Sequence, residues 1–476
     1  MTSIYPRRSF KLIQSYSKLL RCYSNIHVPF QDDLSDIDMD DFGLGDFKHY
    51  QESSDILKRK NKLYDGIDGK TEIKPKQQTQ QTQQNALSLE SMASLKEPSI
   101  FISKLNDPYL NLAIEDYIYN KMPLPSTTSK FNSERLLFYI NSSCVIIGKN
   151  QNPWKEVNLP ILNHLKNYPL IRRKSGGGTV VHDLGNVNFS FMTSKLNFDR
   201  FKFVNLVVDS VNNSKNASKK LEVNKRGDIV TKDGGDEELK ISGSAYKLSK
   251  GKSYHHSTML LNSNLKNLRR ILHRDEKDLG VVDSKSSISS VKSKVTNLEI
   301  DSNKFIEIVS NGFKQEFGLT SEDQEELEQD EETKEFNEIM GLSDFASSIK
   351  STNVFEITSN INLPQEVIDT SNELKTWNWK FGHTPPFHHY LVNDKLGIKL
   401  KFYIEKGKII QIDWELVEPN EEIEFALCKF EEVAIGIEYR GDLIYDLFKF
   451  QYMKISRRIG LWLSRSIDGL HNQGEV

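Results

Sequence analysis

The stretch Ile171–Phe191 reads IRRKSGGGTVVHDLGNVNFSF and places three consecutive glycines directly after the basic run Arg172–Lys174. Glycine has no Cβ, so its backbone can adopt positive φ and lie directly against a ligand. A tight glycine turn can direct several N–H groups at a phosphate or carboxylate, and a neighbouring cation adds electrostatic attraction. Val180–Val181 and the alternating apolar residues of Val187–Phe191 predict strands beside the turn. We therefore predict an anion-binding loop between strands, with a plain hairpin turn as the alternative.

The composition is that of a globular protein without a strong charge bias. The 476 residues include 63 Lys and Arg against 66 Asp and Glu, a formal net charge of −3, so nothing global indicates a nucleic acid or an acidic membrane surface as partner. No apolar run approaches the ~18 residues of a membrane-spanning helix. The three cysteines form no CxxC pair, which indicates a reducing compartment and no cysteine-based zinc site. We expect no nucleic-acid or membrane partner and assign no metal ligands.

The first 95 residues resemble a targeting segment followed by a linker. Residues 1–30 carry five basic residues and no acidic one, with serines, tyrosines and aliphatics interleaved, which is typical of a mitochondrial transit peptide. A basic disordered tail is the alternative. Residues 31–95 contain the acidic run Asp32–Asp46 and the repeat QQTQQTQQ at Gln77–Gln84. Such sequence buries too little apolar surface to fold, so we predict a disordered linker.

The remaining sequence predicts an α/β (α+β) fold in two units. We expect a larger domain over residues 96–318, an acidic insertion or linker over residues 319–345, and a small α/β domain over residues 346–476. Apolar spacing predicts strands at residues 100–102, 136–140, 145–147, 398–404 and 408–414. It also predicts a helix from residue 110 onward and helices at 158–165, 203–211, 303–317, 420–433 and 441–464.

Three blocks in a fixed order carry a resemblance to a known family. They are Arg172–Asn186 (RRKSGGGTVVHDLGN), Lys240–Tyr246 (KISGSAY) with the following His255-His256, and Ser287–Asn297, which ends in KSKVTN. Supporting matches are DPYLNLAIE from residue 107, GKNQNPWKE from residue 148 and WNWKFGHTPP from residue 377. Together they resemble the lipoate-protein ligase A family over roughly residues 99–464, and several long motifs in order are far more specific than any single one.

The resemblance implies a fold and an activity. In that family a catalytic α/β domain shared with biotin ligases, with mixed β-sheets packed against helices, precedes a small accessory domain. The family activates lipoate or octanoate with ATP and Mg²⁺ to an acyl-adenylate, and then transfers the acyl group to a lysine of a lipoyl domain. The implied acceptors are apo lipoyl domains of 2-oxoacid dehydrogenase complexes and the glycine-cleavage H protein. Both fit a location in the mitochondrial matrix.

The resemblance also implies roles for single residues. The central catalytic residue is Lys240, which is expected to contact both ATP and lipoate. The remaining predicted ATP contacts are Arg173, Gly178, Thr179, Val180 and Val181. Predicted lipoate contacts are Arg172, Ser175 and His182, and Asp228 and Ser244 are candidates for holding magnesium or ribose. Without the family match, a surface ion pair would be the ordinary role of Lys240, and a structural hydrogen bond that of His182.

Two departures from the family pattern leave the reaction open. Lys174 stands where the family usually has a third arginine, so the charge stays but the planar bidentate fork is lost. Gly227 replaces a usual asparagine. A lipoyl or octanoyl transferase of the same fold, which takes the acyl group from H protein or a thioester without ATP, is therefore the main alternative. A non-catalytic factor that binds lipoyl domains is a third possibility.

Overall fold

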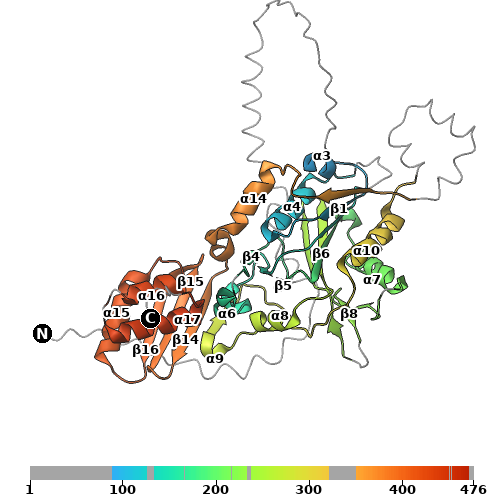
Figure 1. Ribbon diagram of the computed structural model, residues 1–476. Coiled ribbons are helices and arrows are strands. Elements are labelled where there is room, and N and C mark those ends of the chain that lie inside the picture. The colour runs from blue at the N-terminus through green and yellow to red at the C-terminus, as the bar shows by residue number, and fades with distance from the viewer. Residues whose placement is uncertain are drawn as a thin grey trace, which may run out of the picture.

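A computed structural model describes residues 88–125, 133–165, 167–215, 217–232, 237–320, 350–449, 451 and 453–470. The predicted transit peptide, nearly all of the predicted linker and most of the acidic insertion lie outside the described residues. Figure 1 shows a larger unit, coloured blue to yellow, joined to a smaller red unit formed by the C-terminal part of the chain. Among the described residues, no helix has the length and apolar character needed to cross a bilayer.

The larger unit is built on a six-stranded mixed sheet. Its strand order is β10 (Ser244–Ser249), β11 (Lys252–Leu260), β6 (Asn186–Ser194), β2 (Arg135–Tyr139), β1 (Ser99–Ser103) and β13 (Asn353–Ile357). β1 pairs in parallel with β2 and β13, and the other neighbours are antiparallel. Every residue of β6 is buried, so this central strand is covered on both faces.

Helices cover the two faces of this sheet. One face carries α7 (Lys202–Asn213) and α10 (Ser302–Phe317), and the other carries α3 (Leu89–Ala93), α4 (Pro108–Lys121) and α14 (Gln365–Lys375). Side chains alternate along a strand. Phe189 and Phe191 of β6 accordingly lie in the core under α7 and α10, whereas Ser190 faces α4. The α4 face is therefore where the sheet presents polar side chains.

The sequence of α4 explains why its polar residues face the sheet. Asp107 caps the helix by accepting hydrogen bonds from the N–H groups of Tyr109 and Leu110, and proline stands at the first helical position. This start fixes the helix register. Asn111 and Glu115, one turn apart, are then only 1% and 3% exposed on the inner side. Two buried polar groups on one helix face are unusual enough to indicate a site.

A smaller sheet holds the glycine loop. β4 (Leu170–Arg172) and β5 (Val180–His182) lie on either side of β3 (Cys144–Ile147), and the loop of residues 173–179 connects β4 to β5. Side chains of this sheet alternate between two cores. Val145 and Val181 pack toward the C-terminal unit, whereas Cys144 and Ile146 pack toward α4. The loop connects two strands, as predicted, and its sheet lies between the core under α4 and the core of the C-terminal unit.

A third sheet of three short antiparallel strands carries the predicted catalytic lysine. It consists of β7 (Glu222–Val223), β8 (Ile229–Thr231) and β9 (Leu239–Lys240). Other short elements of the larger unit are α5 (Pro153–Glu156), α6 (Leu159–His164), η2 (Lys195–Asn197), α8 (Leu265–Leu272) and α9 (Glu276–Leu279).

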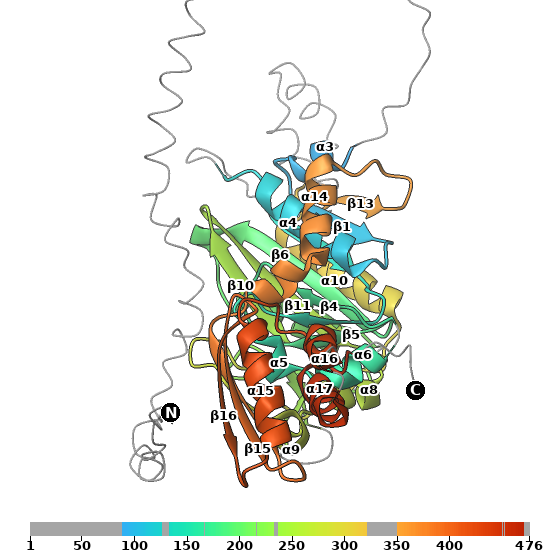
Figure 2. The ribbon, with the colours of Figure 1, turned by 90° about the vertical axis from the view of Figure 1, so that its left-hand side faces the viewer.

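The smaller unit is a four-stranded antiparallel sheet with helices on one face (Figures 1 and 2). Its strands are, in order, β12 (Val281–Asp283), β14 (Phe387–Asn393), β15 (Ile398–Glu405) and β16 (Lys408–Leu416). Its helices are α15 (Glu421–Ala434), α16 (Gly441–Lys449) and α17 (Lys454–Ile467). The prediction of one continuous helix over residues 441–464 is wrong, because the structure has two separate helices there, α16 and α17.

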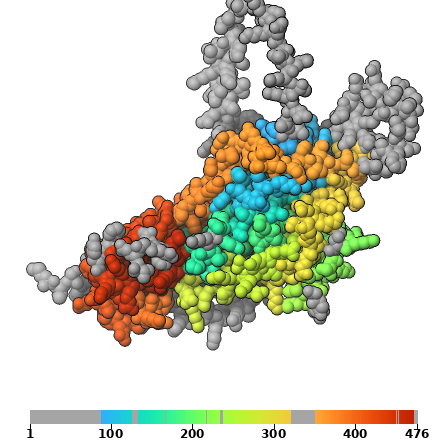
Figure 3. Space-filling model, in the orientation of Figure 1, coloured from blue at the N-terminus to red at the C-terminus, as the bar shows by residue number. Residues whose placement is uncertain are grey.

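The boundary predicted at residue 346 is too early. β13 pairs with β1 along the edge of the large sheet, and Val367 of α14 packs in the core under α4. In Figures 1 and 3 this light-orange segment lies against the blue α4 region, away from the red unit. β12, which comes before the predicted boundary, conversely joins the sheet of the smaller unit. The two units therefore exchange segments instead of dividing at one point.

Candidate active site

The side chain of Lys240 is fixed at the edge of the larger unit. Its ammonium Nζ lies 2.8 Å from Oδ1 of Asp228, and the two side chains are 21% and 8% exposed. The backbone is held on the other side, because Lys240 N–H donates to the carbonyl of Lys294 (2.8 Å) and its own carbonyl accepts from Thr296 N–H (3.0 Å). Two of the three sequence blocks therefore meet at this lysine. Its charge is partly open to solvent, while its backbone is held by hydrogen bonds through both its N–H and its carbonyl.

The absence of a side chain at Gly243 leaves room beside the Lys240 ammonium. A Cβ placed on Gly243 would lie 3.7 Å from Lys240 Cε and 3.9 Å from Nζ. Two residues further along β10, the Cβ of Ala245 lies 3.1 Å from the place where Gly177 would carry a Cβ. The glycine loop and Lys240 thus meet over the start of β10. We call the group formed by Lys240, Asp228, Gly243, Ala245 and Gly177 the Lys240 pocket.

Arg173 holds the glycine loop in shape from inside. Gly177 has φ +88°, a left-handed conformation that favours glycine. The Arg173 guanidinium is 5% exposed and donates from Nε to the carbonyl of Gly176 (3.0 Å) and from an Nη to that of Gly178 (2.9 Å). The predicted ATP contact of Arg173 stays a prediction. In the ligand-free protein its donors serve the loop backbone.

Residues of the third block cover the downstream end of the loop. Ser290 Oγ accepts hydrogen bonds from Thr179 N–H (2.9 Å) and from Gln151 Nε2 (3.0 Å). Gln151 Oε1 in turn accepts from Gly148 N–H and from the Thr179 hydroxyl, both at 2.9 Å. Sequence reasoning missed Gln151 and Ser290 as single residues, although both lie inside the quoted blocks. Their place inside the matched motifs was the available signal.

Arg172 lies in a different environment from its neighbour. Its side chain is fully buried and donates to five backbone carbonyls, those of Gly148, Lys149, Gln151, Trp379 and Lys380, and to the Thr384 hydroxyl. Trp379 Nε1 donates back to the Arg172 carbonyl at 2.7 Å. Burial lowers the pKa of this guanidinium to about 9, so it remains charged at pH 7.

We call this set of groups the Arg172 junction. It ties β4 to the π-helical turn η3 (Asn378–Gly382), which leads into the C-terminal unit. Because Arg172 has no exposed surface, the geometry favours a structural role over the predicted lipoate contact. Trp379 likewise packs with Cys144, Ile146 and Ile171 of the larger unit.

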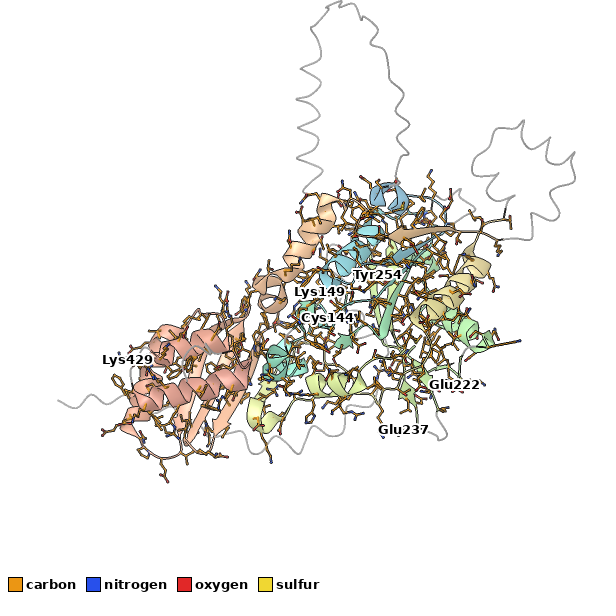
Figure 4. All side chains as sticks on the ribbon, in the orientation of Figure 1. Cys144, Lys149, Glu222, Glu237, Tyr254 and Lys429 are labelled. Atoms are coloured by element: carbon orange, nitrogen blue, oxygen red, sulfur yellow. The ribbon has the colours of Figure 1, made fainter. Side chains whose placement is uncertain are left out.

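A buried polar cluster lies between the small sheet and the large sheet, in the region where Figure 4 labels Cys144 and Tyr254. Glu115 Oε1 accepts from the Ser190 hydroxyl (2.5 Å) and lies 2.8 Å from Nδ1 of His256. His182 and Ser175, two predicted lipoate contacts, are 1% and 2% exposed. Burial and the nearby His256 and Arg173 hold the pKa of His182 well below 6.5, so its imidazole is neutral. Glu115 was not singled out from the sequence.

The two adjacent histidines of β11 point to opposite faces, as strand alternation requires. His255 stacks on Tyr246 with ring centroids 4.4 Å apart, and burial lowers its pKa to about 3. His256 faces Glu115. Val145, Ile147 and Phe189 lie in the two apolar cores.

Asp228 is part of the Lys240 pocket, and Ser244 directly follows Gly243 in the sequence. Ser244 Oγ lies 3.3 Å from Ser257 Oγ, and Asp228 is engaged by Lys240. Within the described residues no three or more His, Cys, Asp or Glu side chains converge as a metal site. Mg²⁺ nevertheless commonly binds through one carboxylate together with substrate phosphates and water. The single carboxylate of Asp228 fits that donor set.

Comparison with known proteins identifies the family of this chain. The family model described as lipoyl protein ligase A/B catalytic domain matches residues 107–317. A Schizosaccharomyces pombe protein named "Putative lipoate-protein ligase A" is 31% identical over 376 residues, which cover 78% of this chain and 94% of that protein. The protein of the same name from Saccharomyces cerevisiae is 38% identical over 330 residues, 69% of this chain and 70% of that protein.

This chain belongs to the lipoate-protein ligase A family. Among solved structures, the crystal structure of LipL1 from P. falciparum in complex with lipoate matches with a TM-score of 0.45 and 24% identity, covering 77% of this chain and 99% of that one. The family match spans the glycine loop, the Lys240 pocket and the Glu115 cluster. The mixed sheets packed with helices are the α/β fold expected for a lipoate-protein ligase.

Proposed function

We propose that this lipoate-protein ligase activates lipoate or octanoate with ATP and Mg²⁺ to an acyl-adenylate and then transfers the acyl group to a lysine of lipoyl domains. The observation that carries the proposal is the Lys240 pocket: a partly exposed ammonium beside Gly243, two residues before Ala245, which lies against Gly177 of the three-glycine loop. Acceptors of the proposed reaction are apo lipoyl domains of 2-oxoacid dehydrogenase complexes and the glycine-cleavage H protein.

The first step joins two anions. A carboxylate oxygen of the fatty acid attacks the α-phosphorus of ATP, the bond to the bridging oxygen breaks, and pyrophosphate leaves. Both reactants repel each other, so catalysis needs fixed positive charge where they meet. The Lys240 ammonium can exchange its partner Asp228 for the carboxylate and the α-phosphate together. A compact ammonium with three rotatable donors suits such a bridging role.

The second step transfers the acyl group. The ε-amine of the acceptor lysine attacks the acyl carbonyl carbon, the carbon–oxygen bond to AMP breaks, and the amine loses a proton. Lys240 can stabilise the charge that develops on the leaving phosphate. Mg²⁺ bound with the nucleotide would neutralise phosphate charge, and Asp228 is the residue placed to hold it, with the Ser244 hydroxyl nearby for the metal or the ribose.

The test uses the purified full-length protein with lipoate, Mg-ATP and an apo lipoyl domain. Pyrophosphate release and an acceptor mass increase of one lipoyl group are the expected results, and both should be lost in Lys240→Ala. Lys247→Ala is a matched control, because Lys247 pairs with Asp116 at 3.0 Å and is 23% exposed, close to the values for Lys240. Equal activity of the two variants would contradict the assignment.

An ATP-independent acyl transferase is the second candidate, and one observation favours it. Two of the predicted nucleotide contacts are already satisfied within the protein, since Thr179 N–H donates to Ser290 Oγ and the Arg173 guanidinium to loop carbonyls. ATP binding would have to displace these contacts. Acyl transfer from lipoyl-H protein to a dehydrogenase lipoyl domain, with no pyrophosphate formed, would establish the transferase instead. A folded protein inactive in both assays would favour the binding factor.

The proposed location is the mitochondrial matrix. Its support is the basic, acid-free composition of residues 1–30, which lie outside the described residues. Fusing residues 1–30 to a fluorescent protein tests this directly. Mitochondrial import and cleavage of the fusion are expected, whereas a diffuse signal would contradict the proposal.

A further inference from the structure

A directional chain of buried hydrogen bonds ends on His182. The Ser103 hydroxyl donates to Asn111 Oδ1 (2.7 Å), Asn111 Nδ2 donates to Asn141 Oδ1 (2.8 Å), and Asn141 Nδ2 lies 3.1 Å from His182 Nδ1. Asn111 Nδ2 also donates to the carbonyl of Leu105 at 2.8 Å. The two asparagines and the histidine are at most 1% exposed. The chain runs from the start of α4, through the end of β2, to β5 directly after the glycine loop.

This series of hydrogen bonds determines which ring nitrogen of His182 carries the proton. The carbonyl of Leu105 can only accept, so the Asn111 group facing it is the amide NH₂, which also reaches Asn141. Asn141 therefore presents its oxygen to Asn111 and its NH₂ to His182. An NH₂ group can only donate, so Nδ1 of His182 must be the unprotonated acceptor. A neutral imidazole then carries its proton on Nε2.

The Nε2–H group of His182 is buried and has no hydrogen-bond partner among the described residues. Buried polar groups in native structures are nearly always paired, and an exception calls for an explanation. The side chain lies between the small and large sheets. Its neighbours there include the Arg173 guanidinium of the glycine loop and the His256 imidazole, both of which act on its ionisation. The donor therefore lies in the layer that separates the glycine loop from the Glu115 cluster.

We infer that Asn111 and Asn141 are positioning residues that hold His182 as an Nε2–H donor for an acceptor oxygen of the acyl substrate. The inference rests on the proposed function, because that function supplies a substrate with a carboxylate or ester carbonyl. For His182, one of the predicted lipoate contacts, the inference names Nε2 as the contacting atom and makes it the hydrogen-bond donor. The two asparagines act through His182, since their side-chain donors and acceptors are directed at protein groups.

The first experiment reads the tautomer in the ligand-free full-length protein. Histidine is labelled with a nitrogen isotope, and long-range ¹H–¹⁵N couplings assign the protonated ring nitrogen, with His182→Gln used to identify the signal among the 11 histidines. The expected state is Nε2–H. Asn141→Asp should shift the proton to Nδ1, because a carboxylate only accepts. Asn188→Asp is the matched control, since Asn188 is equally buried and, among the described residues, its side chain is bonded to Asn186 and to the Tyr139 carbonyl.

The second experiment measures lipoate affinity by calorimetry in the same proteins. Asn141→Asp should weaken binding by about tenfold or more, the effect of losing one buried hydrogen bond to a charged acceptor. His182→Gln can still place an amide N–H near the Nε2 position, whereas the shorter His182→Asn places it near Nδ1. We expect Asn at position 182 to weaken binding several-fold more than Gln.

The possible outcomes separate the two claims. An Nδ1–H tautomer in a wild-type protein that still activates lipoate would overturn the inference and leave the proposed function standing. A shifted tautomer in Asn141→Asp with unchanged lipoate affinity would do the same. If lipoate does not bind the wild-type protein at all, the proposed substrate and the ligand assignment of His182 both fail. If Asn141→Asp does not fold, the wild-type tautomer and the Gln–Asn pair at position 182 still decide the question.

Discussion

The Arg172 junction and the Lys240 pocket each hold one cation near the glycine loop, and the two cations have opposite roles. Arg172 is fully buried, and its donors reach backbone carbonyls and one hydroxyl. Lys240 is 21% exposed and pairs with one carboxylate beside a glycine. A cation bonded to the backbone stabilises a shape, because those acceptors cannot leave. A cation paired with a side chain at a partly open site can exchange that partner for a substrate anion.

The largest expected effect tests whether Arg172 stabilises the fold. Arg172→Ala should lower the free energy of unfolding by about 3–4 kcal/mol, because several buried carbonyls lose their donor at once. Denaturant unfolding measures this. Arg465→Ala, on the exposed side of α17, is the control and should change stability by less than about 0.5 kcal/mol. A similar stability for both variants would remove one side of the comparison.

Lys240→Ala tests the other side. We expect the rate of pyrophosphate release to fall about 10²- to 10³-fold, as for the loss of one preorganised electrostatic contact in a transition state. Stability should change by less than about 1 kcal/mol, because the lost ion pair is partly exposed. Steady-state kinetics and unfolding on the same sample give both numbers. A large loss of stability with a small loss of rate would assign Lys240 to the scaffold.

The conformation of the glycine loop can be tested by substituting Gly177. Gly177→Ala should cost about 1–3 kcal/mol of stability, because φ is +88° and the new Cβ would lie 2.8 Å from an Arg173 nitrogen. Gly243→Ala is the matched variant. Its nearest neighbour to a Cβ is Thr258 Oγ1 at 3.5 Å, so its stability should change by less than about 1 kcal/mol. Equal thermal shifts in the two variants would contradict the described loop conformation.

A smaller, pH-dependent effect on stability comes from His389, a buried histidine of the smaller unit. His389 bonds the Tyr439 hydroxyl (2.8 Å) and the Leu279 carbonyl (2.6 Å) through its two ring nitrogens, and burial lowers its pKa to about 3. The unfolded chain binds this proton below about pH 6.5, so His389 makes stability fall as the pH drops from there toward 3. His389→Gln should flatten that slope by at most about 1.4 kcal/mol per pH unit. An unchanged slope would mean that the histidine is already charged in the folded protein.

The strands and helices that depend on local sequence were predictable. The pair Val180–Val181 located β5, the alternating apolar residues of Val187–Phe191 located β6, and the Asp107–Pro108 start placed α4 within two residues. The family motifs predicted that Lys240 and the glycine loop share a site. In the structure Gly243 lies beside Lys240, and Ala245, two residues later, lies beside Gly177. These features depend on backbone periodicity and on short motifs, which a single sequence carries.

What could not be predicted depends on contacts between distant segments. β13 joins β1 across more than 250 residues of chain, and Arg172 finds acceptors more than 200 residues away at Trp379 and Lys380. No local pattern distinguishes Arg172 from Arg173, because both are arginines of one basic run. Only the packing around each guanidinium decides which acceptors its N–H groups reach. The burial of Glu115 beside His256 is hidden in the sequence for the same reason.

The exchange of labelled pyrophosphate into ATP, measured with lipoate and Mg²⁺ but without any acceptor protein, tests the central claim most directly. The reaction isolates adenylation from acyl transfer and from acceptor choice. The account predicts exchange that requires lipoate, is lost in Lys240→Ala and persists in Lys247→Ala. Exchange that is absent from the folded wild-type protein, or that survives the loss of Lys240, would contradict it.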